Sequence, residues 1–372
     1  MNLLVCFDHG YSDSYSNDPG LYRPALWHLW DNQEEVLSIP FPRDPRDFEE
    51  IDSLLHGTKP LISAKSFEKL PRYGLAGMVL INNQIYASSW NSIYEIDPQN
   101  LDVKKIISHP LICDAHGIAG DERFLITVLT SKDTVVLTDF DGKIIDHFSI
   151  MRDLSIKKLD GLGEIDWRFI SKQYRGSCGF WHFNHAQLIG DELWLTSRNA
   201  SCFVVIDLVL RKARLRLINH RSPNLLHDGV HVNGRFYFTS IDGKIIIAED
   251  SIESNLHTRT DEIHLDNLEI YHRDLVQKVI KLNDPSSLNR EPNWCRGLEV
   301  CGDTIFTTID GAYGSELSFG LLGILESGKV VFEKRLKWAD FGDENELRYM
   351  SGFDILNLDT TNTDLSRFGV NE

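Results

Sequence analysis

Histidine, carboxylate and arginine side chains recur at two positions in a repeated pattern along this chain. The first position directly precedes a small residue and is filled by Ala76, His116, His185, Asp228, Arg296 and Ser351. The second lies three residues later and is filled by Val79, Ala119, Leu188, His231, Glu299 and Asp354. Imidazole and carboxylate groups exchange protons or ligate divalent metals, and a guanidinium grips an anion through its planar fork. If the fold gathers these positions, the chain can act chemically on a small anionic molecule.

The elements that carry these side chains are six segments with one shared design. Each has a small residue, an apolar strand, a polar turn and a second strand. The turns are Asn82-Asn83, Gly120-Asp121-Glu122, Gly190-Asp191-Glu192, Asn233-Gly234 and Gly302-Asp303. Such residues adopt positive φ cheaply and are typical of hairpins. Third and fourth strand patterns follow, such as FVVIDL and ARLRLI, so the sequence predicts four antiparallel strands per unit.

The spacing of the units predicts how they assemble. The small residues at 77, 117, 186, 229, 297 and 352 lie 40, 69, 43, 68 and 55 residues apart. Four-stranded units that recur about every 40 residues or more are typical of a β-propeller. The excess falls in insertions at roughly 151–178, 250–290 and 338–349. Two packed β-sandwiches are the alternative.

The last unit has a single strand pattern, and the N-terminal segments NLLVCF, PALWHLW and EEVLSI supply the missing strands. We therefore expect an all-β, six-bladed β-propeller that is closed by N-terminal strands completing the last blade, with long loop insertions on one face. It forms a single domain over residues 1–372. The expected blades are 72–110, 111–150, 180–220, 224–282, 292–338, and 348–358 plus 1–42.

On this pattern the whole chain resembles the six-bladed propellers, although it lacks the Gly-His and Trp-Asp pairs or the double glycine of named repeat classes. The resemblance implies that the first strand of each blade is innermost, so that the first position rings the mouth of a central channel. Residues three apart on an ideal strand face opposite sides. Both positions reach the channel only if the strand starts irregularly, or if one serves the mouth and the other the shaft.

The expected catalytic residues are His116, His185, Asp228 and Arg296. The expected metal ligands are His116, His185, His231 and Glu299, with His227 and Asp354 as alternates. This donor set suits Zn, Mn, Fe or Ca. The layout loosely resembles metal-dependent propeller lyases that act on uronic acids or cyclic esters. It is also similar to the lactonase propellers, which bind calcium through a Glu/Asn/Asp site. Glu299 and Asp354 match that site in residue type, whereas the histidines depart from it.

These residues predict an enzyme with its active site at the channel mouth: a metal-assisted lyase, hydrolase or isomerase acting on a small anionic molecule. The alternative is a non-catalytic propeller that binds a ligand or a protein. No nucleotide cofactor is expected, because the segment GLGEID lacks the glycines of a phosphate loop. His182 is interpreted as a structural residue packed on Trp181. The segment 270–282 has apolar residues at helical spacing and predicts a short helix.

Composition limits the partners. The net charge of −17 argues against nucleic acid or an anionic membrane surface as a partner. No stretch reaches the roughly 20 apolar residues of a membrane span, and no signal-peptide pattern follows the first residues. The 6 cysteines have neither zinc-finger nor paired spacing. We expect a cytoplasmic protein with reduced thiols and a small-molecule substrate or ligand, and a protein partner is compatible with the same composition.

Overall fold

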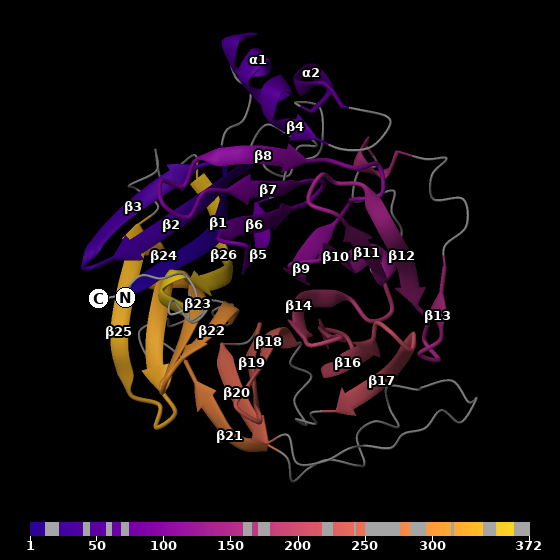
Figure 1. Cartoon of the computed structure of the whole chain (residues 1–372). Helices are drawn as coiled ribbons and strands as arrows, with labels where there is room; N and C mark the ends of the chain where they lie inside the picture. The colour runs from indigo at the N-terminus through magenta and orange to yellow at the C-terminus, as the bar shows by residue number, and fades with distance from the viewer. Residues whose placement is uncertain are drawn as a thin grey trace, which may run out of the picture.

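The predicted small-residue units each become one sheet in the computed structural model. The structure describes residues 1–11, 22–39, 45–56, 62–67, 74–158, 166–169, 179–217, 226–241, 243–249, 276–282, 295–313, 316–337 and 347–360. Six antiparallel sheets stand side by side in a ring around a central axis (Figure 1). The expected all-β, six-bladed propeller is therefore confirmed, and the β-sandwich alternative is wrong.

The first three blades follow each other along the chain, and each is ordered from its inner to its outer strand. Blade 1 contains β5 (Leu75–Ile81), β6 (Gln84–Ser89), β7 (Ile93–Ile96) and β8 (Val103–Ile107). Blade 2 contains β9 (Ala115–Asp121), β10 (Phe124–Leu129), β11 (Thr134–Thr138) and β12 (Ile144–Ile150). Blade 3 contains β14 (Phe183–Ile189), β15 (Glu192–Ser197), β16 (Cys202–Asp207) and β17 (Lys212–Leu217).

The other three blades complete the ring. Blade 4 contains β18 (Leu226–Val232), β19 (Arg235–Ser240), β20 (Lys244–Glu249) and β21 (Val276–Lys281). Blade 5 contains β22 (Cys295–Cys301), β23 (Thr304–Tyr313), β24 (Glu316–Leu325) and β25 (Val330–Lys337). Blade 6 contains β26 (Leu347–Asn357), β1 (Asn2–Tyr11), β2 (Tyr22–Trp30) and β3 (Gln33–Ser38).

Blade 6 joins the two ends of the chain. Its inner strand β26 pairs antiparallel with β1, placing Leu4 opposite Leu356 and Val5 opposite Ile355. The N-terminal strands thus close the ring, as the sequence predicted. Without this pairing β26 would expose an unpaired edge, and such edges invite association with other strands.

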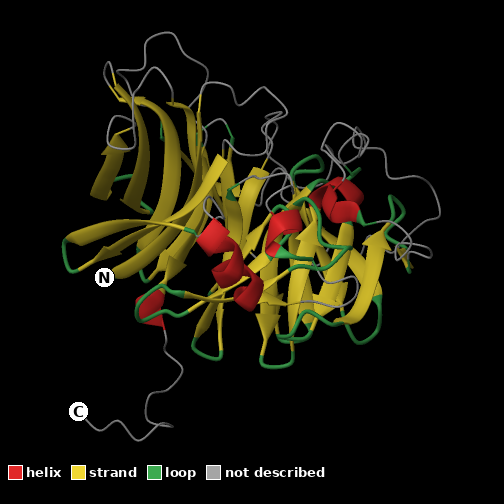
Figure 2. Cartoon of the chain, turned by 90° about the horizontal axis from the view of Figure 1, so that it is seen from above, coloured by secondary structure: helices red, strands yellow, loops and turns green. Residues whose placement is uncertain are grey.

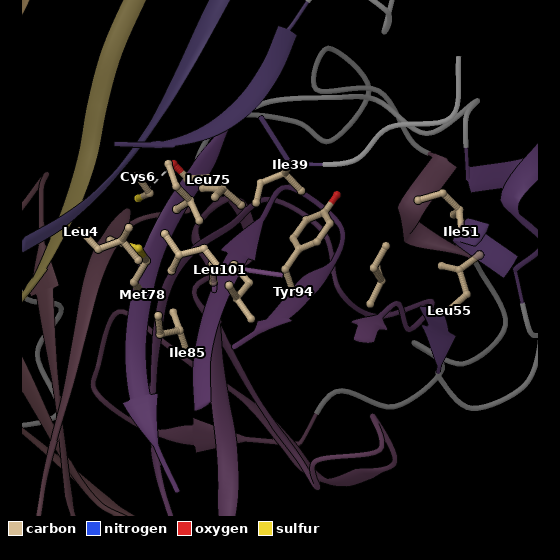
Figure 3. Packing of buried hydrophobic residues seen from close by; sticks show 14 of the residues in the cluster. Leu4, Cys6, Ile39, Ile51, Leu55, Leu75, Met78, Ile85, Tyr94 and Leu101 are labelled. Atoms are coloured by element: carbon tan, nitrogen blue, oxygen red, sulfur yellow. Dashed lines mark hydrogen bonds between the residues drawn. The ribbon is translucent and has the colours of Figure 1, made fainter. Parts of the chain in front are cut away.

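Apolar clusters fill the spaces between neighbouring blades, because each blade presents buried side chains on both faces. One cluster joins blades 6 and 1 through Leu4, Cys6 and Met78, and Figure 3 shows these side chains meeting beside Ile85 and Tyr94. Equivalent clusters lie between every other pair of adjacent blades. The ring is therefore stabilised by side-to-side packing of blades.

Short elements are added at the outer edges of blades 1 and 2. The helices α1 (Pro45–Leu54) and α2 (Ala64–Phe67) lie on the outside of the ring beside blade 1 (Figures 1 and 2). The strand β4 (Leu55–His56) pairs parallel with β8, and β13 (Ile156–Lys157) pairs with β12. The described residues also include single 3-10 turns at Thr130–Lys132, Trp167–Phe169 and Leu358–Thr360. No helix in the described ranges is long and apolar enough to cross a membrane.

The helix predicted for 270–282 is wrong. Val276–Lys281 forms β21, which pairs with β20 and supplies the fourth strand of blade 4. Pairing with an existing sheet outweighs a short helical pattern of apolar residues, since three of the six strand residues are β-branched. The insertion expected at 250–290 is interrupted by this strand. The structure does not describe the rest of this insertion, which includes residues 270–275 of the predicted helix. Most of the insertions at 151–178 and 338–349 also lie outside the described residues.

Candidate active site at the start of the inner strands

Each inner strand contains a β-bulge, which lies near the first residues in blades 1 to 5 and within β26 in blade 6. The residues left without a direct partner opposite are Ala76, His116, Asn184, His227 or Asp228, Gly297 and Phe353. A bulge sets two residues of one strand against one of its neighbour and breaks the alternation of side chains. This irregular start is one of the two arrangements under which both sequence positions reach the axis. The end of the ring at which the inner strands begin is called the mouth below.

The repeated small residue lets adjacent inner strands approach each other at the mouth. A Cβ atom on Gly77 would lie 2.7 Å from the carbonyl oxygen of His116. A Cβ atom on Gly117 would lie 2.9 Å from the backbone nitrogen of Ala186. A side chain at either glycine would push neighbouring blades apart. The small residues therefore bring the polar residues beside them into one group.

The centre of this group is a hydrogen-bonded pair on β18. His227 Nδ1 lies 3.0 Å from Asp228 Oδ2, and the two residues are 6% and 1% exposed. The same carboxylate oxygen accepts the backbone N–H of Gly297 on blade 5. The backbone N–H of Asp228 donates to Thr239 Oγ1 at 3.1 Å. Neighbouring strands thus fix Asp228, and Asp228 in turn orients His227.

The protonation states of this pair follow from burial and mutual contact. Burial lowers the pKa of His227, and this outweighs the opposite effect of the Asp228 charge. Burial alone would raise the pKa of Asp228. The charges of His227 and His185 and the hydrogen bonds from His227 and Gly297 outweigh it and bring that pKa below its usual value. At neutral pH the pair is a neutral imidazole hydrogen-bonded to a carboxylate.

The other expected catalytic residues surround this pair. Burial lowers the pKa of His185, which is close enough to feel the charges of Asp228 and His227. The charges of Arg296 and His116 both lower the pKa of His227, so these side chains also lie near it. The Arg296 guanidinium is 4.7 Å from the centre of the Phe353 ring. His116, His185, Asp228 and Arg296 come from four successive blades, and each of them interacts electrostatically with His227.

Asp354 and Glu299 lie on the inner strands of blades 6 and 5. Asp354 Oδ2 accepts the backbone N–H of Met78 on blade 1 at 2.7 Å, and its Oδ1 accepts that of Ile355 at 2.9 Å. Burial, and next the charge of Asp228, raise the pKa of Asp354 well above its usual value. Burial also raises the pKa of Glu299 to about 8. Asp354 therefore ties the last blade to the first.

His231 points away from this group. Its ring stacks on Trp194, with centroids 5.2 Å apart and an interplanar angle of 4°. Its backbone N–H donates to Gln187 Oε1 at 2.8 Å. The structure thus places His231 in the packing between blades 3 and 4, because the bulge at Asp228 precedes it and fixes its direction.

The expected metal ligands are not gathered into one cluster in the described part of the chain. Among the described residues, no group of three or more His, Cys, Asp or Glu side chains has the arrangement to hold one. Both oxygens of Asp354 accept backbone N–H groups, and Asp228 Oδ2 is bonded to His227 and Gly297. Metal binding, with the identities expected from the sequence, stays a prediction that the arrangement does not favour.

Sequence reasoning missed three polar residues at the edge of the group. His182, which was interpreted as structural, lies with its ring centroid 6.3 Å from that of His116. Arg198 Nη1 is 3.4 Å from His182 Nε2. Asp114 Oδ1 is 3.5 Å from His116 Nδ1. A usable pattern existed for Asp114 and His182, because each directly precedes an inner strand.

Comparison with known proteins shows the fold alone. No family model and no curated protein matches the chain. A chain of a nidogen/laminin complex superposes with a TM-score of 0.51 and 10% sequence identity, over 95% of this chain and 98% of that one. A protein of unknown function from Bacteroides caccae gives a TM-score of 0.47 and 11% identity, over 95% and 97%. Hydrazine synthase from Kuenenia stuttgartiensis gives 0.43 and 11%, over 72% and 67%. The chain is a six-bladed β-propeller that is similar in architecture to the nidogen/laminin chain.

Proposed function

We propose that this propeller is an enzyme that moves a proton on a small anionic molecule at the mouth. The observation that carries the proposal is the buried His227–Asp228 pair with Arg296 beside it. A histidine oriented by a carboxylate is a common general base, and an arginine is the usual clamp for a carboxylate or phosphate. The reaction classes that fit are elimination, hydrolysis and isomerisation.

Each group has a role in this proposal. Because Nδ1 of His227 donates to Asp228, Nε2 is the nitrogen that takes a proton. The Asp228 carboxylate then stabilises the imidazolium, and its bond to the Gly297 N–H keeps it in place. The lowered pKa of His227 keeps the imidazole neutral before the reaction. Arg296 holds the anionic group of the substrate, and the His227 imidazolium returns the proton to the product. His185 and His116 lie beside the pair and adjust its charge state.

A binding propeller without chemistry is the second candidate. Arg296 at a mouth lined with histidines would hold an anion equally well in a protein that does not turn it over. The two candidates differ in one property, since only the enzyme exchanges protons with its ligand.

The test measures that exchange directly. Small 2-hydroxy, 2-keto and phosphorylated carboxylic acids are incubated with the protein in D2O, and loss of the carbon-bound proton next to the carboxylate is followed by proton NMR. We expect exchange for at least one acid, reduced by about 100-fold or more in His227→Gln. The matched control is His28→Gln, since His28 lies on β2 and bonds Asn2.

The outcomes separate the candidates. Exchange that persists in His227→Gln would assign the chemistry elsewhere. Binding of acids without exchange, lost in Arg296→Gln, would favour the binding propeller. Melting temperatures of all variants show whether a loss reflects unfolding.

A further inference from the structure

A second group of basic side chains lies beside the proposed catalytic pair, over blade 3. It consists of His182, which leads into β14, and Arg198, which follows β15, and their nitrogens are 3.4 Å apart. His116 connects this group to the catalytic pair, because its ring is 6.3 Å from that of His182 and its charge acts on His227. Both groups therefore belong to one continuous polar rim at the mouth.

The backbone that presents His182 is strained and firmly held. His182 has a φ of 51°, and Asp114 at the same place before blade 2 has a φ of 54°. The Asp133 carboxylate accepts the backbone N–H groups of Trp181 and His182, each at 3.0 Å. The N–H of Arg198 donates to the carbonyl oxygen of His182 at 3.1 Å. Non-glycine residues held in the left-handed region by several contacts concentrate at functional sites.

The order of the blades places the two arginines on either side of the catalytic pair. Arg198 belongs to blade 3, the pair belongs to blade 4, and Arg296 belongs to blade 5. Each guanidinium presents N–H donors in a planar fork that suits a carboxylate or phosphate. One anionic group needs only one such fork. A second fork across the reacting centre suits a molecule with an anionic group at each end.

We propose that the substrate is a small dianion, with one anionic group held by Arg296 and the other by Arg198 with His182. This inference rests on the proposed function and specifies the substrate of the same site. The two anionic groups are carboxylates or a carboxylate and a phosphate, separated by the short chain on which His227 acts.

The test compares probes that differ only in the second charge. Linear dicarboxylates from malonate to adipate are titrated against monocarboxylates of equal carbon number by isothermal calorimetry. Phosphonoacetate and 3-phosphonopropionate test a phosphate-like second group. We expect one chain length to bind about tenfold or more tightly than its monoanionic partner, as one added charged hydrogen-bonded contact implies.

Two variants examine the second clamp. Arg198→Gln removes the fork, and His182→Asn removes the imidazole while keeping a residue type that tolerates positive φ. Both should abolish the preference for dianions and leave monocarboxylate affinity within about twofold. Arg123→Gln is the matched control, because Arg123 lies at the far end of β9 and β10 and bonds Asp121 and Asp191.

Failure of this inference can be told from failure of the proposed function. A dianion preference that survives in Arg198→Gln overturns the second clamp. Monocarboxylate binding that depends on Arg296, with no preference for dianions, also overturns it and leaves the proposed function standing. If no carboxylate or phosphonate binds, both proposals fail.

Discussion

Glu299 provides a quantitative test of the electrostatics of the inner strands. It lies on β22 opposite Phe306, and burial raises its pKa to about 8 from a usual value of 4.5. In the unfolded chain the carboxyl group releases its proton near pH 4.5. In the folded protein it keeps the proton until about pH 8. The folded protein therefore loses stability as pH rises between these two values.

The size of this loss follows from the two pKa values. The full difference between 4.5 and about 8 corresponds to about 5 kcal/mol of unfolding free energy. Glu299 retains partial exposure, which reduces the effect, so we expect about 3 kcal/mol. Glu299→Gln cannot ionise and should not lose this contribution. Below pH 4 the variant and the native protein should have similar stability, and at pH 9 the variant should be about 3 kcal/mol more stable.

The assay is urea unfolding of both proteins at intervals from pH 4 to pH 9, with the difference in unfolding free energy plotted against pH. Other titrating groups largely cancel in this difference. Glu34→Gln is the control, because Glu34 is exposed on β3 and undergoes the same change of side chain at the surface. If the difference in unfolding free energy between Glu299→Gln and the native protein stays constant from pH 4 to pH 9, the inference that Glu299 is protonated in the folded protein at neutral pH is refuted.

Further predictions concern catalysis, packing and metal content. Asp228→Asn should lower proton exchange by about 100-fold or more in the NMR assay, because an amide cannot stabilise the imidazolium. Gly117→Ala should cost about 1 to 3 kcal/mol in urea unfolding, since its Cβ meets backbone at 2.9 Å, whereas Gly234→Ala at an open turn should cost about 1 kcal/mol. Asp166→Asn should cost about 3 to 5 kcal/mol because Arg168, 1% exposed, would lose its 2.6 Å ion pair. Elemental analysis of the purified protein should find no stoichiometric divalent metal. A metal that is present in the native protein and lost in the variant with His116→Ala and His185→Ala would contradict the acid–base assignment.

The fold was predictable because a small residue precedes the hairpin of every blade, and at two of these positions the packing reason is direct. Where inner strands approach each other, the backbone of the next blade occupies the place of a side chain, as at Gly77 and Gly117. The sequence records this requirement as glycine at both positions. The missing strands of the last unit were equally readable, since an open β26 edge needs a partner and the N-terminal segments NLLVCF, PALWHLW and EEVLSI have strand patterns.

The direction of individual side chains was less predictable. The second position of each unit was expected to face the same way in every blade. The bulge, however, falls at His227 or Asp228 in blade 4 and at Gly297 in blade 5. As a result His231 packs on Trp194, whereas Glu299 lies near Asp354. The position of a bulge depends on contacts between blades, such as the bond from the Gly297 N–H to Asp228. A single strand pattern does not contain this information.

Asp354 and Asp228 each accept a backbone N–H from the next blade, but their pKa values are shifted in opposite directions. Asp354 accepts the N–H of Met78 from the next blade, and Asp228 accepts the N–H of Gly297 from the next blade. Burial, and next the charge of Asp228, raise the pKa of Asp354, whereas the charge and hydrogen bond of His227 help to outweigh burial and lower the pKa of Asp228. Environments that push the pKa values of nearby groups apart are typical of catalytic sites. Asp228 therefore differs from Asp354 because the β18 bulge places His227 next to it. The same carboxylate that joins blades 4 and 5 is hydrogen-bonded to an imidazole.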